Sequence, residues 1–275
     1  MNVKSKQLLE EAYLYADQLS KHTILSHYWN QLSLVLKGSV SRGNSDQYSD
    51  IDFVFFCDEN VRQTIIKAYK EAGLVDREDG VFLPINEWAG HYHFESFDML
   101  NQYHAKNNRP QMWEYGHAIA IHDPLQRYKS TLTQLTHQAS HTFIDDIRTT
   151  YLDTQLALDW MRHPLKRGDV ISASLHATTI IRKLCQLCYL VDLKNYPHDK
   201  WLSHYLNQTT LGSMIEQDMI TYLKCLPTAE TLLPNLELED YPCYGQAKKL
   251  VEQCGSYLLE KFGDHPWIKE WYLHT

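Results

Sequence analysis

Two apolar runs with a polar segment between them limit what this chain can form more than any other feature. The first run covers residues 32–36 and the second covers residues 51–56. Each is long enough for a β-strand and too short for a typical helix. The segment between them begins with Gly38-Ser39, and glycine is suited to a tight turn because it adopts backbone angles that other residues avoid. We therefore expect strand, turn, polar segment and strand across residues 32–57.

A pair of carboxylates stands where the second predicted strand begins. Asp50 and Asp52 are two residues apart, so in a strand their side chains project from the same face. Adjacent carboxylates repel each other unless a cation lies between them, and Mg²⁺ is commonly held by one or two carboxylates together with phosphate oxygens and water. The turn at Gly38-Ser39 adds backbone N–H groups and a hydroxyl that suit a phosphate. The pattern predicts a site for a metal ion and a nucleotide.

The order of these features resembles the signature of the nucleotidyltransferase superfamily related to DNA polymerase β. That signature is Gly-Ser followed by Asp-x-Asp or Asp-x-Glu. Three segments narrow the resemblance to lincosamide nucleotidyltransferases: residues 43–53, residues 90–94, which resemble their G-E-F-H-F strand, and residues 165–169, which resemble their L-K-R-G-E sequence. Aminoglycoside adenylyltransferases share this layout, so the resemblance implies the reaction type more than the acceptor.

One position departs from the lincosamide pattern. The glutamate of G-E-F-H-F, which resembles a third catalytic carboxylate, corresponds here to His91. An imidazole can accept a proton but cannot bridge metal ions as a carboxylate does. Three interpretations follow: Glu95 supplies the third metal-binding carboxylate in a shifted register, His91 or His93 acts as the base, or catalysis is impaired. We favour Glu95, although in a regular strand it lies about 13 Å from His91; Asp98 and Glu87 are weaker candidates.

The expected arrangement of the site suggests which residues would contact the metal and the triphosphate. Asp50 and Asp52 would bind Mg²⁺. Ser39, with the amides around Gly38, would hold the phosphates of the leaving pyrophosphate. We also expect contacts to these phosphates from cationic side chains, namely Arg42, Lys166, Arg167 and Lys200.

Length and composition suit a cytoplasmic enzyme. The chain has 275 residues, of which 44% are hydrophobic, which is enough for two domains with real cores. A net charge of −8 argues against a general nucleic-acid-binding protein. No run approaches 18 apolar residues and the N-terminus lacks the pattern of a secretory signal, so we expect no membrane span. Six scattered cysteines indicate reduced thiols.

The pattern along the chain predicts an α+β protein with two domains. Residues 1–105 read as a nucleotidyltransferase domain, a mixed β-sheet with flanking helices: an N-terminal helical region, strands at 32–37, 51–57, 74–75, 81–85 and 91–99, and a helix at 61–72. Residues 106–275 read as an all-α helical bundle that binds substrate and nucleotide, broken at His163-Pro164 and resumed with Asp169 as a helix cap. We expect the active site between the domains.

The predicted reaction is transfer of a nucleoside monophosphate, AMP from ATP in the first instance, to a hydroxyl of a small molecule with release of pyrophosphate. An antibiotic, either an aminoglycoside or a lincosamide, is the acceptor that the resemblance implies, and its modification would confer antibiotic resistance. We expect a monomer or homodimer without nucleic-acid or membrane partners. Two other readings stay open: an antitoxin-like enzyme that adenylylates a protein, and a pseudoenzyme that binds ATP without turnover.

Overall fold

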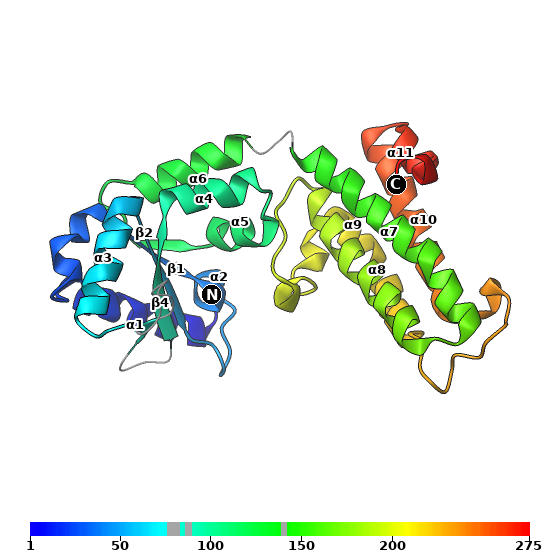
Figure 1. Ribbon diagram of the computed structural model, residues 1–275, viewed down its shortest axis with the longest axis horizontal. Helices are drawn as coiled ribbons and strands as arrows, with labels where there is room; N and C mark the ends of the chain where they lie inside the picture. The colour runs from blue at the N-terminus through cyan, green and yellow to red at the C-terminus, as the bar shows by residue number, and fades with distance from the viewer. Residues whose placement is uncertain (76–82, 86–89, 139–141) are drawn as a thin grey trace. The chain divides into compact units, whose positions relative to one another are not determined.

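The computed structural model describes residues 1–75, 83–85, 90–138 and 142–275, which form two compact units, Met1–Ala139 and Ser140–Thr275. The N-terminal unit contains a mixed five-stranded sheet with helices around it (Figure 1). Its strands are β1 (Ser33–Lys37), β2 (Ile51–Cys57), β3 (Leu83–Pro84), β4 (Gly90–Ser96) and β5 (Ile119–His122). They are ordered β3-β4-β2-β1-β5, with β2 and β4 parallel and the other neighbours antiparallel. The α+β class and the mixed sheet predicted from the sequence are confirmed.

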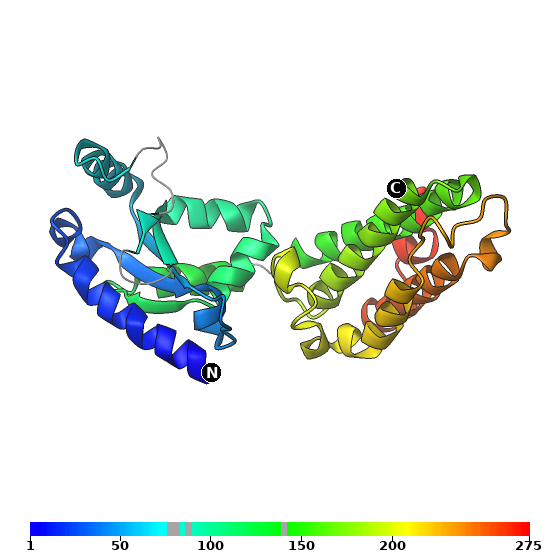
Figure 2. The same cartoon turned by 90° about the horizontal axis from the view of Figure 1, so that it is seen from below.

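Helices cover both faces of the sheet. α1 (Val3–Ser20) and α3 (Glu59–Glu71) lie on one face, and α4 (Phe97–Ala105), α5 (Arg109–Gly116) and α6 (Arg127–Gln138) lie on the other (Figures 1 and 2). The short α2 (Gly38–Arg42) follows β1, and two 3₁₀ turns, Leu25–His27 and Trp29–Gln31, join α1 to β1. Each face of the sheet therefore has its own helical layer.

Alternation along β2 explains why both faces are covered. Phe53 and Phe55 pack into the core beneath α1 and α3, whereas Val54 and Phe56 pack into the core beneath α4 to α6. All four are fully buried, as expected for a central strand whose apolar run is continuous. A slip of one residue would exchange the side chains that pack into the two cores.

The described residues of the C-terminal unit form helices and no strand. The α-helices are α7 (Thr142–Arg167), α8 (Val170–Leu190), α9 (Thr210–Lys224), α10 (Pro242–Phe262) and α11 (Pro266–Lys269) (Figure 1). Single 3₁₀ turns occur at Asp199–Trp201, Leu206–Gln208, Leu238–Asp240 and Trp271–Leu273. Asp169 caps α8 as predicted, since its carboxylate accepts the Ser172 N–H at 3.0 Å.

Several local predictions differ from the structure. β5 pairs with β1, so the segment 106–139, which we assigned to the helical domain, belongs to the N-terminal unit. Pro164 lies inside α7 and does not break it; the helix ends only three residues later, so the missing N–H affects its last turn alone. β4 ends at Ser96, whose hydroxyl caps α4. Residues 74–75 are not a strand, and of the predicted strand 81–85 residues 81 and 82 lie outside the described residues.

All six cysteines lie in the described part of the chain and none is in a disulfide; Cys185 and Cys188 are buried in α8. Across the described ranges, no helix is both long enough and apolar enough to span a membrane.

Candidate active site

The first element of the site is the contact between Gly38 and Asp52. Antiparallel pairing of β1 with β2 sets Lys37 opposite Asp52, so α2 begins directly beside this carboxylate. Gly38 has a φ of +80°, and a Cβ atom on it would lie 2.6 Å from Asp52 Oδ2. A side chain at position 38 would therefore be strained and would also displace the aspartate. This explains physically why glycine opens the turn.

The second element comes from the neighbouring strand. Parallel pairing of β2 with β4 sets Asp52 opposite His91. His91 Nε2 lies 3.1 Å from Asp52 Oδ1, and His91 Nδ1 lies 3.9 Å from Asp50 Oδ2. One ligand atom from each of the three residues lies within 4.8 Å of the others. The structure thus brings together three of the four residues that the sequence analysis named as catalytic.

The electrostatics of this group suit a cation. Burial raises the pKa of Asp52, and the neighbouring Asp50 carboxylate raises it further, against the opposing effect of His91. Burial lowers the pKa of His91 although both carboxylates favour its protonated form. Two carboxylates held together in a partly buried position are stabilised by a divalent ion. The residues present therefore fit the divalent metal that the sequence pattern predicts.

Glu114 of α5 is a third element, which the sequence analysis missed. Its Oε1 atom accepts the Gly38 N–H at 2.7 Å and a hydrogen bond from Arg42 Nη1 at 2.9 Å. The Arg42 side chain is 3% exposed and its guanidinium lies 5.1 Å from the centre of the Trp113 ring. Glu114 therefore ties both ends of α2 to α5. No short motif signals this contact, because more than 70 residues separate the partners.

The predicted phosphate ligands of α2 have different surroundings. Arg42 is buried in its ion pair with Glu114, which makes it a residue that positions α2. Ser39 is half-buried, and its hydroxyl lies 3.4 Å from the hydroxyl of Ser45. The Gly38 amide, expected to face phosphate, already donates to Glu114. Contact of Ser39 with phosphate stays a prediction.

Glu95 lies apart from the metal-binding group. It is opposite Phe56 in the β2–β4 pairing, whereas His91 is opposite Asp52. Glu95 is buried, accepts the Tyr115 hydroxyl at 2.6 Å and lies 3.1 Å from His93 Nε2. The register is regular, so the shift that would have made Glu95 the third metal ligand does not occur. Asp98 is in the first turn of α4, and Glu87 lies outside the described residues.

The remaining predicted cations belong to the C-terminal unit. Lys166 and Arg167 form the last turn of α7, and Lys166 Nζ lies 3.9 Å from Glu237 Oε2. Lys200 is an exposed residue of the 3₁₀ turn at Asp199–Trp201. Their contact with a triphosphate stays a prediction.

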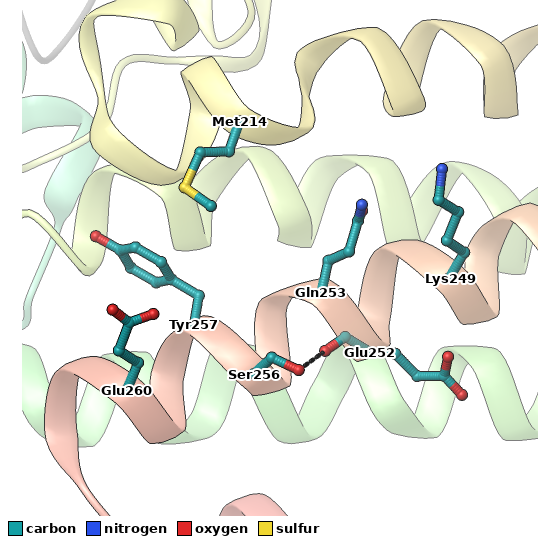
Figure 3. Close-up of a pocket in the computed structure, with 7 residues that line it drawn as sticks. All are labelled: Met214, Lys249, Glu252, Gln253, Ser256, Tyr257 and Glu260. Carbon is teal, nitrogen blue, oxygen red and sulfur yellow. Dashed lines mark hydrogen bonds between the residues drawn. The ribbon is translucent and has the colours of Figure 1, made fainter.

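The C-terminal unit also has a surface pocket. Met214 of α9 faces a row of side chains on α10 across it (Figure 3). Asp218 accepts hydrogen bonds from Lys249 and Gln253 of this row. None of the residues selected from the sequence lines the pocket, so we assign it no part in the site.

A comparison with protein families agrees with this geometry. Residues 22–88 match the family described as nucleotidyltransferase domain, a span that includes β1, α2 and β2. Among curated proteins, none matches the sequence. A crystal structure of a nucleotidyltransferase-like protein from Exiguobacterium sibiricum 255-15 is similar at 14% identity and a TM-score of 0.49, covering 89% of this chain and 79% of that chain. The family match falls on the segment that carries Gly38, Asp50 and Asp52, so this part of the chain is similar to a nucleotidyltransferase domain.

Proposed function

We propose that this nucleotidyltransferase transfers AMP from ATP to a hydroxyl of a small molecule and releases pyrophosphate. The observation that carries the proposal is the grouping of Asp50, Asp52 and His91 beside the start of α2. Carboxylates at this place would hold a divalent cation, which when bound neutralises charge on the phosphates of the nucleotide. An antibiotic with exposed hydroxyls, either an aminoglycoside or a lincosamide, is the acceptor that we propose.

Side chains of the protein would accept the proton, orient the phosphates and position α2 during the reaction. The acceptor hydroxyl oxygen forms a bond to the α-phosphorus while the bond from that phosphorus to the β-phosphate oxygen breaks. The hydroxyl proton passes to a basic group of the site, either a carboxylate or an imidazole, and from there to water. Ser39 orients the departing phosphates, and Glu114 with Arg42 keeps α2 in position. Lys166, Arg167 and Lys200 are proposed contacts to the triphosphate from the C-terminal unit. We place the reaction in the cytoplasm, where nucleoside triphosphates are available.

Pyrophosphate release tests the proposal. The full-length protein is incubated with ATP and Mg²⁺ or Mn²⁺ against pooled aminoglycosides and lincosamides, and the products are examined for a mass increase of one AMP. We expect release that depends on acceptor and is abolished in the Asp50→Asn/Asp52→Asn variant. Asp17→Asn, on an exposed part of α1, is the matched control and should retain full activity. Equal release by the double variant and the wild type would reject these aspartates as the site.

One observation favours a second function. His91 occupies the position at which the lincosamide pattern has a glutamate, so a protein that binds ATP without turnover is the alternative. It predicts saturable ATP binding with no pyrophosphate release for any acceptor, whichever divalent ion is supplied. The same assay, run beside a calorimetric titration with ATP, separates the two functions.

A further inference from the structure

We infer that the metal centre contains His91 as a nitrogen ligand, and that it therefore favours a first-row transition ion such as Mn²⁺ over Mg²⁺. The inference deepens the proposed function, on which it rests for the task of the ion.

Strand pairing places the imidazole among the carboxylates. His91 is directly opposite Asp52 in the parallel β2–β4 pair, and its Nε2 lies 3.1 Å from Asp52 Oδ1. Two neighbouring ligands of an octahedral ion are about 3 Å apart when each lies about 2.1 Å from the metal. The observed separation therefore matches that of two ligands on one ion, without any movement of the backbone.

The backbone beside the site also fixes His91. Gly90 has a φ of +151°, and a Cβ atom there would lie 2.3 Å from the Ile51 carbonyl oxygen. The strands are thus in close contact next to all three ligand residues. On the other side, the ring of His93 stacks against the ring of His91 at 6.5 Å and lies 3.1 Å from Glu95 Oε1 through its own Nε2. The close approach at Gly90 thus restrains the backbone beside His91, and the ring of His93 lies next to its imidazole.

Among the described residues, no further carboxylate joins the group of Asp50, Asp52 and His91. In the portion of the chain that the structure describes, Asp50, Asp52 and His91 are the one group of three potential ligands. Glu95 is opposite Phe56 and is engaged by Tyr115 and His93. The third ligand that the described residues offer is therefore the imidazole nitrogen of His91.

Nitrogen changes which ion the site prefers. Mg²⁺ is a hard ion that takes oxygen ligands and retains much of its water, whereas imidazole suits transition ions. Affinity for a site with nitrogen ligands rises along the first row from Mn²⁺. Exchanging one carboxylate for an imidazole also removes a negative charge, which weakens binding of a hard cation most. The expected result is tighter binding of Mn²⁺ than of Mg²⁺.

Metal binding to the full-length protein tests this inference without any acceptor. Calorimetry gives the dissociation constants for Mn²⁺ and Mg²⁺, and pulsed electron paramagnetic resonance of bound Mn²⁺ detects coupling to a directly bound nitrogen. In the wild type we expect Mn²⁺ to bind at least about tenfold more tightly, with nitrogen coupling. In His91→Glu the preference should fall by about tenfold and the coupling should disappear. His163→Glu, at an exposed position of α7, should change neither.

A measurement on the wild-type protein keeps the inference testable if His91→Glu fails to fold. Protein grown with ¹⁵N-histidine should show the nitrogen coupling of ¹⁵N in place of ¹⁴N. Absence of coupling in the wild type, or the same preference in His91→Glu as in the wild type, would overturn the inference. Pyrophosphate release with Mg²⁺, together with an absence of nitrogen coupling to bound Mn²⁺ in the wild type, would reject this inference and leave the proposed function standing. Nitrogen coupling without release for any acceptor would leave it standing and reject the proposed function.

Discussion

Gly38 and Asp52 depend on each other because the space that a side chain at position 38 would need is filled by the aspartate carboxylate. The positive φ of Gly38 adds a second restriction. Gly73 also has a positive φ, but apart from its chain neighbours no heavy atom of the described residues lies within 4 Å of the place where its Cβ would be. The two glycines therefore separate the backbone effect from the steric effect.

Gly38→Ala should cost about 2–4 kcal/mol of stability, because backbone strain and the clash with Asp52 add. Gly73→Ala should cost about 1 kcal/mol, because only the backbone strain applies. Urea unfolding measures both, and Mn²⁺ titration should show weaker binding for Gly38→Ala alone. Equal costs for the two variants would mean that the carboxylate moves aside freely.

Glu114 Oε1 accepts a hydrogen bond from Nη1 of Arg42, whose side chain is 3% exposed. Glu114→Ala should therefore destabilise the N-terminal unit by about 3–5 kcal/mol, since removing one partner of a buried ion pair leaves a charge uncompensated. Asp17→Ala, which breaks an exposed pair with Lys21, should cost less than about 1 kcal/mol. If the urea unfolding midpoints of Glu114→Ala and the wild type agreed within error, Arg42 would have found a new partner in the variant.

Asp52 should oppose stability when no metal is present. Its pKa is raised chiefly by burial and then by Asp50, so the ionised carboxylate is less favourable in the folded protein than in the unfolded chain. Asp52→Asn should therefore raise the stability of the metal-free protein by about 0.5–2 kcal/mol while abolishing metal binding. Asp58→Asn is the control with the opposite expected result, a loss of stability, because a hydrogen bond from Arg127 lowers the pKa of Asp58. A decrease in stability for both variants would contradict this account.

At the scale of elements, Asp192 joins the start of α9 to the end of α10. Its Oδ2 atom accepts the Thr210 N–H at 2.9 Å, and its Oδ1 atom lies 3.3 Å from Lys261 Nζ. Burial acts to raise the pKa of Asp192, but the hydrogen bonds from Thr210 and Lys261 outweigh it and the net shift is downward. The ionised carboxylate therefore stabilises this corner of the helical unit.

Asp192→Asn should cost about 1–2 kcal/mol at pH 7, because a charge-assisted hydrogen bond and an ion pair are lost. A lowered pKa in the folded state means that this stabilisation is present above the unfolded-state pKa of about 3.9 and is lost as pH falls through the folded value. The difference between wild type and variant in urea unfolding should therefore shrink from pH 7 to pH 3. A constant difference across this range would exclude the carboxylate charge as its source.

The individual strands show which parts of the fold could be predicted from the sequence and which could not. β2 was predicted at 51–57 because its apolar run is continuous and buried on both faces. β5 was not predicted, because its four residues are only partly buried and their place depends on pairing with β1. Asp50 and Asp52 follow from local spacing, whereas the contacts of Glu114 join residues more than 70 positions apart. The separation of Glu95 from the site follows from the β2–β4 register, which only the pairing reveals.

At the scale of the whole molecule, the sheet has cores of its own. All residues of the two cores that pack against it come from Met1–Ala139. Leu187 of α8, in Ser140–Thr275, is fully buried as well. Two compact units with separate cores are expected to unfold as separate cooperative units.

Leu187→Ala should therefore destabilise the helical unit by about 2–5 kcal/mol while leaving the sheet unaffected. Phe53→Ala should do the reverse, at about 3–5 kcal/mol. Hydrogen exchange with mass spectrometry reads the two units separately in the intact chain. Faster exchange in both units from either substitution would show that they unfold together.

The pairing of β4 with β2 has a practical consequence for anyone who wishes to redesign this catalyst. Main-chain hydrogen bonds and the contact at Gly90, not the imidazole itself, determine where residue 91 lies. Substitution of residue 91 by glutamate, aspartate or cysteine would therefore change the ligand type at a fixed location. Position 91 is thus a suitable site for matching the enzyme to a chosen ion.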